Sequence, residues 1–310
     1  MDILSELERY SVKVIEITNS TQSNIGIPAY VINLDEDNYR RGYMKYMLKL
    51  LNINYKLIIV QRVNDAICKK NPRMRKGVIG CSLSHLWCIR DAIKCKHQNF
   101  LILEDDIVFH KNFLGLFRQT NYTKYDLLQL GCCDFCLHTN IKNKYTPNVY
   151  RPTKNALGAY GNIYNLNFAK VFFNEKVNNF SEFDISMQTF YDRFKIGVCY
   201  PYLVSSELST TNLDHKFSIF DKQSLRFTKC CFLEYKPDDY YFVWIVFLKY
   251  CYEEYKNMTF KKALNYNNLI QQFAERHKGI QDKISPVLQN NGLKIKDIYE
   301  ILDNYKEERI

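Results

Sequence analysis

The sequence lacks a long hydrophobic run and a leader-like start. Its longest apolar stretch, residues 240–248, is far shorter than the roughly 20 apolar residues that a membrane-spanning helix needs. The amino terminus is charged from Asp2 onward, which excludes a secretory signal peptide. These absences predict a cytoplasmic protein without a membrane span.

Low-complexity tracts and nucleic-acid-binding motifs are also missing. The chain is 46% hydrophobic and 15% aromatic, which is typical of a globular protein. Its formal net charge of +10 favours a polyanion, a nucleotide or an acidic membrane surface as partner. However, its Lys and Arg residues are scattered, without the interleaved aromatics of nucleic-acid-binding segments. We therefore expect no nucleic-acid partner.

No disulfide framework is expected, although the chain has eleven cysteines. An odd count leaves at least one thiol unpaired, and most of these cysteines lie inside apolar runs. Cys133 and Cys136 form a Cys-x-x-Cys pair, but no second pair follows with the spacing of a zinc site. The sequence therefore predicts reduced thiols, with packing favoured over metal or redox chemistry.

The most informative stretch that is present covers residues 99–109. Residues 100–103 form an apolar run that predicts a strand buried on both faces, and the run ends at Glu104, Asp105 and Asp106. Carboxylates this close together oppose folding unless a cation or donor groups lie among them. Mg²⁺ or Mn²⁺ prefers such oxygen ligands. The alternative is a solvated turn after a strand, and this stretch alone leaves both interpretations open.

An α/β pattern opens the chain. Residues 29–34 and 55–60 predict buried strands, and the apolar residues of 41–51 recur at helical spacing between them. Asn33 and Arg40 follow the first strand closely, at the end where open α/β sheets bind ligands. Arg40 either contacts a phosphate or forms a salt bridge within the following helix.

A glycine-containing segment follows at residues 77–85. Its glycines precede a helix that we expect to begin near Ser82 or Ser84, so that a ligand could approach the backbone closely and an anion could lie at the helix start. The spacing fits neither the Rossmann fingerprint nor the phosphate loop. His85 is either a packed helix residue or a substrate contact.

Three blocks carry a family resemblance. They are an Ile-Asn-Leu with Arg40 seven residues after Asn33, the Gly-x-Ile-Gly-Cys-x-x-Ser-His of residues 77–85, and the acidic triplet at 104–106. Together they resemble glycosyltransferase family 25, which contains lipooligosaccharide and collagen-hydroxylysine galactosyltransferases. The resemblance covers about residues 28–215, and the chain departs from many members by having Val78 in place of Glu.

The resemblance implies a GT-A-like, Rossmann-type mixed α/β sheet flanked by helices. We expect an N-terminal arm at 1–27, a nucleotide-sugar-binding catalytic domain at 28–222 and a C-terminal helical region at 223–310. Within the catalytic domain, residues 125–131 resemble a strand, residues 132–155 a variable surface loop and residues 200–204 the last core strand. The C-terminal helices are a cap, an acceptor-side lid or a homo-oligomer surface.

The family resemblance also implies an activity. A metal-dependent, inverting enzyme would move galactose or glucose from a UDP-sugar donor to an acceptor hydroxyl on a glycan or glycoprotein. It implies Mn²⁺ more than Mg²⁺, with Asp106 as a direct ligand and Glu104 or Asp105 as second ligand or ribose contact. A late histidine, His215, would complete the metal site, with the alternative that it is a surface residue.

Further residues take roles by the same resemblance. Ser84 and His85 would support the nucleotide or the loop of the acidic triplet, and Asn33 and Arg40 would contact the donor. Asp184 is the candidate general base, with the alternative that it caps a helix over residues 185–194.

Two other functions remain open. A non-catalytic carbohydrate- or nucleotide-binding protein could share the fold, although the intact acidic triplet argues against it. A metal-dependent phosphoesterase could also use three acids, but it would need paired Asp and His ligands at short spacing, which the sequence lacks.

Overall fold

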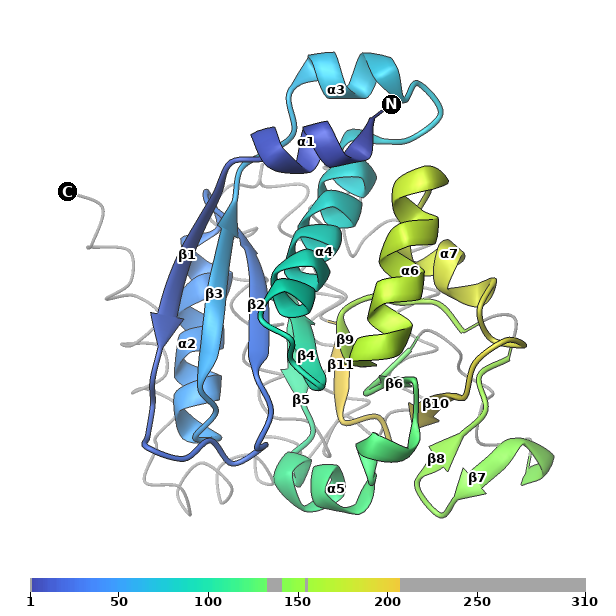
Figure 1. Ribbon diagram of the computed structural model, residues 1–310. Coiled ribbons are helices and arrows are strands. Elements are labelled where there is room, and N and C mark those ends of the chain that lie inside the picture. Colours follow the sequence, from blue (N-terminus) through green and yellow to red (C-terminus); the bar gives the residue numbers. More distant parts are fainter. Residues whose placement is uncertain (1, 133–140, 154–155, 207–310) are drawn as a thin grey trace, which may run out of the picture. The chain divides into compact units, whose positions relative to one another are not determined.

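The computed structural model describes residues 2–132, 141–153 and 156–206 (Figure 1). The chain divides into two compact units, Met1–Tyr235 and Lys236–Ile310, and every described residue belongs to the first. The helices predicted within 223–310, with any oligomer surface on them, and His215 lie outside the described residues. Within the described part, every helix is too short or too polar to cross a membrane.

The described residues alternate between helices and strands. The helices are α1 (Ile3–Arg9), α2 (Asn38–Leu50), α3 (Asp65–Lys70), α4 (Lys76–Lys94), α5 (Phe113–Gln119), α6 (Leu166–Asn178) and α7 (Phe183–Gln188). The strands are β1 (Val12–Ile17), β2 (Ala29–Leu34), β3 (Tyr55–Val60), β4 (Asn99–Glu104), β5 (Ile107–Phe109), β6 (Leu127–Gln129), β7 (Lys144–Thr146), β8 (Val149–Tyr150), β9 (Gly161–Asn165), β10 (Ile196–Cys199) and β11 (Val204–Ser206).

Most of these strands form one mixed sheet of nine strands, in the order β1-β3-β2-β4-β9-β6-β10-β8-β7. Strands β3, β2 and β4 are parallel neighbours, whereas β9 runs antiparallel to both β4 and β6. Helices α4 and α6 lie side by side over one face of the sheet, and α2 lies behind it (Figure 1). The predicted mixed α/β class, with a large sheet flanked by helices, is confirmed.

The core follows from the apolar runs of the central strands. The side chains of β4 from Phe100 to Leu103 are fully buried, as the sequence predicts for a strand covered on both faces. Strand β2 is buried from Ala29 to Asn33. The six cysteines in the described residues are all free.

Two predicted segments differ from the structure. Residues 200–204 are not the last core strand, because β10 takes that place and β11 pairs with β5 outside the large sheet. Pro201 has no backbone N–H to donate to a strand ladder, which disfavours a core strand there. The predicted surface loop at 132–155 contains β7 and β8, which extend one edge of the sheet.

Candidate functional site

The connections of the parallel strands create a crevice between β2 and β4. The chain leaves β2 through α2 and joins the sheet again as β3 on one side, and then passes through α4 to β4 on the other side. Open α/β sheets bind ligands at such a reversal of strand order, outside the carboxyl ends of the strands. Because Ile32 pairs with Glu104, Asn33 and the acidic triplet reach this edge together.

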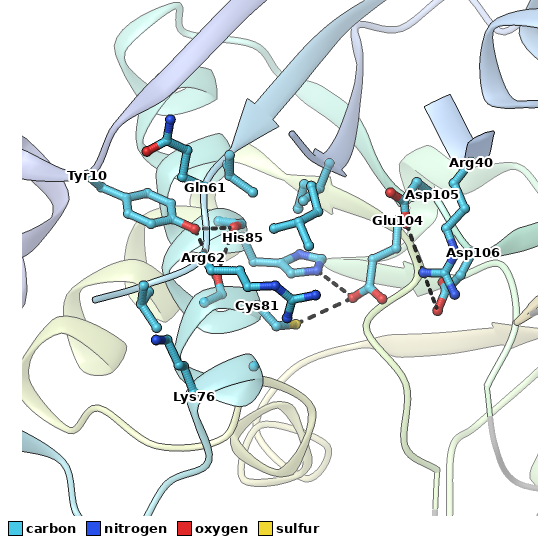
Figure 2. Close-up of a pocket in the computed structure, with 17 residues that line it drawn as sticks. Tyr10, Arg40, Gln61, Arg62, Lys76, Cys81, His85, Glu104, Asp105 and Asp106 are labelled. Carbon is cyan, nitrogen blue, oxygen red and sulfur yellow. Dashed lines mark hydrogen bonds and ion pairs between the residues drawn. The ribbon is translucent and has the colours of Figure 1, made fainter. Parts of the chain in front are cut away.

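A cleft lies at this position (Figure 2). It is lined by the ends of β2, β3 and β4, by the first half of α4 and by Tyr10, which follows α1. Its charged lining residues are Arg40, Arg62, Lys76, Glu104, Asp105 and Asp106. Cationic and anionic side chains therefore share one cleft, as a site for a phosphate and a metal ion would require.

Asp105 is held on the β2 side of the cleft. Its Oδ2 accepts a hydrogen bond of 2.6 Å from Asn33 Nδ2, and its Oδ1 lies 3.3 Å from Arg40 Nη1. Burial raises the pKa of this carboxyl to about 6, although the Arg40 guanidinium acts to lower it. Arg40 itself is buried and also pairs with Asp37, which supports the salt-bridge interpretation of this residue. Asp105 therefore ties the loop of the acidic triplet to β2 and α2.

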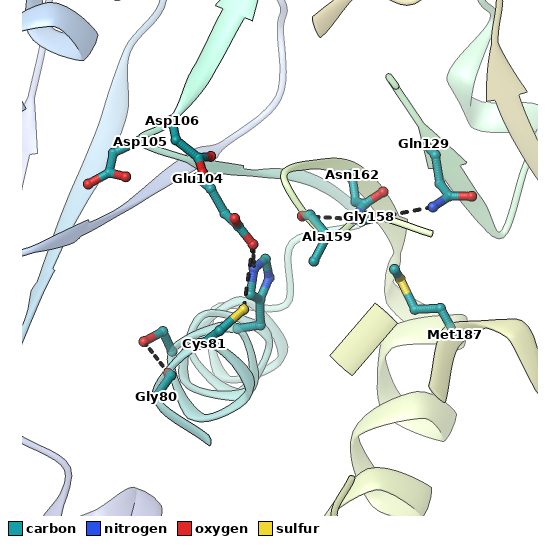
Figure 3. A network of polar contacts seen from close by, with 12 residues as sticks. Gly80, Cys81, Glu104, Asp105, Asp106, Gln129, Gly158, Ala159, Asn162 and Met187 are labelled. Carbon is teal, nitrogen blue, oxygen red and sulfur yellow. Dashed lines mark hydrogen bonds and ion pairs between the residues drawn. The ribbon is translucent and has the colours of Figure 1, made fainter. Parts of the chain in front are cut away.

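Glu104 points the opposite way, toward α4 (Figure 3). Its Oε1 lies 2.8 Å from His85 Nε2 and accepts a hydrogen bond of 3.6 Å from Cys81 Sγ. These three ligand-type atoms all lie within 4.8 Å of one another. Burial, followed by the charges of Glu104 and Asp184, raises the pKa of the Cys81 thiol well above its ordinary value, so the thiol remains protonated and donates.

His85 is fixed by contacts on two sides. Its ring stacks on Phe183 of α7, with ring centroids 4.4 Å apart and planes at 27°. Because a carboxylate can only accept, Nε2 carries the proton that is donated to Glu104. His85 is fully buried, and within the described part of the chain its Nδ1 has no hydrogen-bond partner. The imidazole therefore holds Glu104 through Nε2.

Helix α4 begins earlier than the sequence predicts. It starts at Lys76, so Ser82, Ser84 and His85 lie in its interior and not at its start. The Ser84 hydroxyl donates to the carbonyl of Gly80 at 2.7 Å and lies 2.9 Å from the Tyr10 hydroxyl. Glycines are poor helix formers and Arg75 at the N-cap makes no side-chain cap bond, so the true start has no local signal.

One comparison with known protein families agrees with the motif pattern. Residues 27–187, just over half of the chain, match the family model described as "Glycosyltransferase family 25 (LPS biosynthesis protein)". The chain belongs to glycosyltransferase family 25. Comparison with curated proteins finds no match.

One similar solved structure is the crystal structure of a glycosyltransferase involved in the glycosylation of the major capsid of PBCV-1. The two chains share 11% sequence identity at a TM-score of 0.34, and the likeness covers 66% of this chain and 98% of the other. The family assignment rests on the family model.

In this family 25 glycosyltransferase, Asp184 is not among the residues that line the cleft, but the preceding residue, Phe183, stacks on the lining residue His85. Asp184 is the second residue of α7, whose N-cap is Glu182, so the alternative that Asp184 caps a helix over 185–194 is wrong. Its Oδ1 accepts from the backbone N–H of Ile185 at 2.8 Å. The negative charge of Asp184 helps to raise the pKa of the Cys81 thiol, as the charge of Glu104 does. The Asp184 carboxylate therefore lies near Cys81 and Glu104.

The start of α7 is held by a buried lysine that the sequence analysis missed. Lys176 Nζ of α6 donates to Ser181 Oγ at 3.0 Å and to the Glu182 carbonyl at 3.1 Å, and it also contacts the Ser186 hydroxyl. Burial lowers the pKa of Lys176 to about 8. This lysine fixes the segment that carries Asp184.

The predicted site residues of this glycosyltransferase mostly converge. The cleft is lined by Arg40, Ser84, His85, Glu104, Asp105 and Asp106, and Asn33 lies directly behind Asp105. Sequence reasoning missed Cys81, Arg62 and Lys76 as lining residues. A signal for Cys81 is present, because residues four apart on a helix share one face and His85 is four positions later.

Proposed function

We propose that this glycosyltransferase binds a UDP-sugar and a divalent cation in the cleft, and transfers galactose or glucose with inversion to an acceptor hydroxyl on a glycan or glycoprotein. The observation that carries the proposal is that carboxylates of the acidic triplet and the cations Arg62 and Lys76 line the same cleft. Departure of a nucleoside diphosphate needs nearby positive charge, because negative charge develops on its phosphates. The carboxylates would provide it by holding a divalent cation, and Arg62 and Lys76 would provide it directly.

The carboxylates suit a hard cation. Glu104 and Asp106 keep 25% and 18% of their side-chain surface exposed in the cleft, and their oxygens are the ligands that Mn²⁺ and Mg²⁺ prefer. Asp105 is buried and held by Asn33 and Arg40, whereas Asp106 lies farther from Arg40, at 3.9 Å from Nη1, and is more exposed, so we assign the cation to Glu104 and Asp106. A cation bound there would neutralise charge on the departing diphosphate.

Arg62 and Lys76 are suited to bind the phosphates. Arg62 Nε donates to Glu36 at 2.7 Å and Lys76 Nζ to Asp65 at 2.9 Å, and both of these carboxylates are exposed. Exposed ion pairs contribute at most about 1 kcal/mol, so a phosphate can replace these carboxylates at little cost.

We assign Asp184 as the general base that takes the proton of the acceptor hydroxyl. Inversion needs one base and no covalent sugar intermediate, and the half-buried Asp184 carboxylate in the first turn of α7 would meet an incoming acceptor. The buried Lys176 and the Phe183 ring would keep this carboxylate in place.

The test uses a panel of UDP-sugars with Mn²⁺ and measures released UDP and transferred sugar. One or two donors should give transfer that EDTA abolishes. Asp106→Ala should lose metal-dependent donor binding, while the exposed Asp192→Ala should keep it. Donor binding without turnover would favour a non-catalytic binding protein, and release of phosphate from simple esters would favour a phosphoesterase.

A further inference from the structure

Cys81, His85 and Glu104 form a cluster that differs from the oxygen ligands of a Mn²⁺ site (Figure 2). Cys81 and His85 lie one turn apart on α4 and project toward the end of β4, where Glu104 meets them. A thiolate, an imidazole and a carboxylate together are typical ligands of Zn²⁺. We propose that this cluster is a binding site for Zn²⁺ or another borderline-soft divalent metal ion.

The distances suit tetrahedral coordination. With bonds of about 2.0 Å to nitrogen and oxygen and about 2.3 Å to sulfur, neighbouring ligand atoms lie about 3.3 to 3.6 Å apart. The Cys81 Sγ to Glu104 Oε1 distance is already 3.6 Å, and the His85 Nε2 to Glu104 Oε1 distance is 2.8 Å. The third pair, Cys81 Sγ and His85 Nε2, lies within 4.8 Å, so small side-chain shifts that open the His85–Glu104 pair would admit the ion.

The cluster has the surroundings of a site with an open position. All three residues line the cleft, so that water or a substrate can supply the fourth ligand. The stack on Phe183 holds the imidazole in the orientation that directs Nε2 at the site. Binding releases the Cys81 thiol proton to solvent and requires the tautomer of His85 in which Nδ1, not Nε2, carries the proton. The thiolate sulfur, the bare Nε2 and a Glu104 carboxylate oxygen then each form one bond to the metal.

Occupancy would have a consequence for activity. Glu104 cannot serve the soft ion and the cation of the donor at once, so Zn²⁺ in this site should inhibit sugar transfer. This second part rests on the proposed function, whereas the metal site itself does not.

The first experiment is a titration of the full-length protein with Co²⁺ as a spectroscopic substitute for Zn²⁺, in a phosphine reductant. Wild type should bind one equivalent of Co²⁺ more than Cys81→Ser does. The extra Co²⁺ should give a thiolate-to-cobalt charge-transfer band, and added Zn²⁺ should abolish this band. The comparison of wild type with Cys81→Ser is needed because the chain has eleven cysteines, and thiols elsewhere can also bind Co²⁺. The control is Cys95→Ser, at the exposed end of α4, which should bind as wild type does.

A second variant covers the case in which Cys81→Ser does not fold. Glu104→Gln keeps an acceptor for the His85 hydrogen bond but removes the anionic ligand, and it should weaken Co²⁺ binding at this site at least about tenfold. Equal stoichiometry and spectra in wild type and Cys81→Ser would overturn the site, as would unchanged affinity in Glu104→Gln.

An activity measurement separates this inference from the proposed function. Zn²⁺ should slow wild-type transfer, and Cys81→Ser should need at least about tenfold more Zn²⁺ for the same fractional loss. Equal inhibition of both proteins would overturn the regulatory part. Absence of transfer with every metal would refute the proposed function and leave the Co²⁺ result standing.

Discussion

Phe183 stacks on His85 with the ring centroids 4.4 Å apart, and this contact joins α7 to α4 at the cleft. On one side of the stack, His85 holds Glu104 through Nε2. On the other side, the residue after Phe183 is Asp184. The stack therefore links Glu104, which we assign as a metal ligand, with Asp184, which we assign as the base. The placement of both carboxylates depends on this contact.

The first prediction concerns His85 as a positioning residue. His85→Leu removes the donor to Glu104. It should lower kcat at least about tenfold and lower the free energy of unfolding by roughly 1.5–3 kcal/mol, the range for a hydrogen bond to a charged group. His85→Gln can still donate and should recover much of the rate. Transfer assays and urea unfolding measure the two effects. Wild-type kcat in His85→Leu would show that Glu104 needs no support.

The second prediction concerns Asp184. Asp184→Asn keeps the shape of the side chain but removes its basicity, and it should slow transfer by about 10²-fold or more with donor binding near normal. Calorimetry with the donor and single-turnover transfer separate the two effects. An unchanged transfer rate would remove Asp184 from the mechanism. Its matched control is Asp192→Asn, an exposed aspartate paired with Arg151.

The fold could be predicted where local and tertiary signals agree. The run at residues 100–103 is apolar because β4 is covered on both faces, and the acids end it where the strand reaches the cleft. The start of α4 could not be predicted, since Gly77 and Gly80 oppose a helix locally. Packing of Ile79 and Leu83 against Ile3 and its neighbours in α1 offsets that preference.

The sequence predicts which residues belong to the site, but it does not predict how their side chains are oriented or which partners they contact. Three consecutive acids indicate a metal site, but side chains alternate at the end of a strand, so Glu104 and Asp105 face different partners. The partners of Asp105 come from another strand and helix, and no local pattern identifies them. Lys176 was missed for the same reason, because its acceptors are defined by the loop between α6 and α7.

The third prediction is a pH dependence caused by Asp105. Its pKa is about 6 in the folded protein and near 3.8 when unfolded, so the folded state binds more protons between these values. The resulting stabilisation is complete below about pH 4 and is lost as the pH rises through about 6, a change of up to about 3 kcal/mol. Chemical unfolding of metal-free wild type and Asp105→Asn should show their free-energy difference changing by this amount between pH 4 and 7. A pH-independent difference would contradict it.

The fourth prediction concerns Gly80, whose backbone lines the cleft within α4. A Cβ added there would meet only Val63 Cγ1, at 3.8 Å, so the folded protein has room for alanine. Gly80→Ala should therefore raise stability by roughly 0.5–1 kcal/mol, as alanine does within a helix. If the donor packs against this turn of α4, the added methyl should nevertheless weaken donor binding by about tenfold or more, which is about 1.4 kcal/mol.

The matched control for Gly80 is Gly131. A Cβ at Gly131 would lie 2.0 Å from the backbone carbonyl oxygen of Val204, so Gly131→Ala should lower the melting temperature. Thermal melts with and without UDP-sugar measure stability and binding together. A more stable Gly80→Ala protein that binds the donor like wild type would place the donor away from α4, and the cations Arg62 and Lys76 would then lose their assigned role.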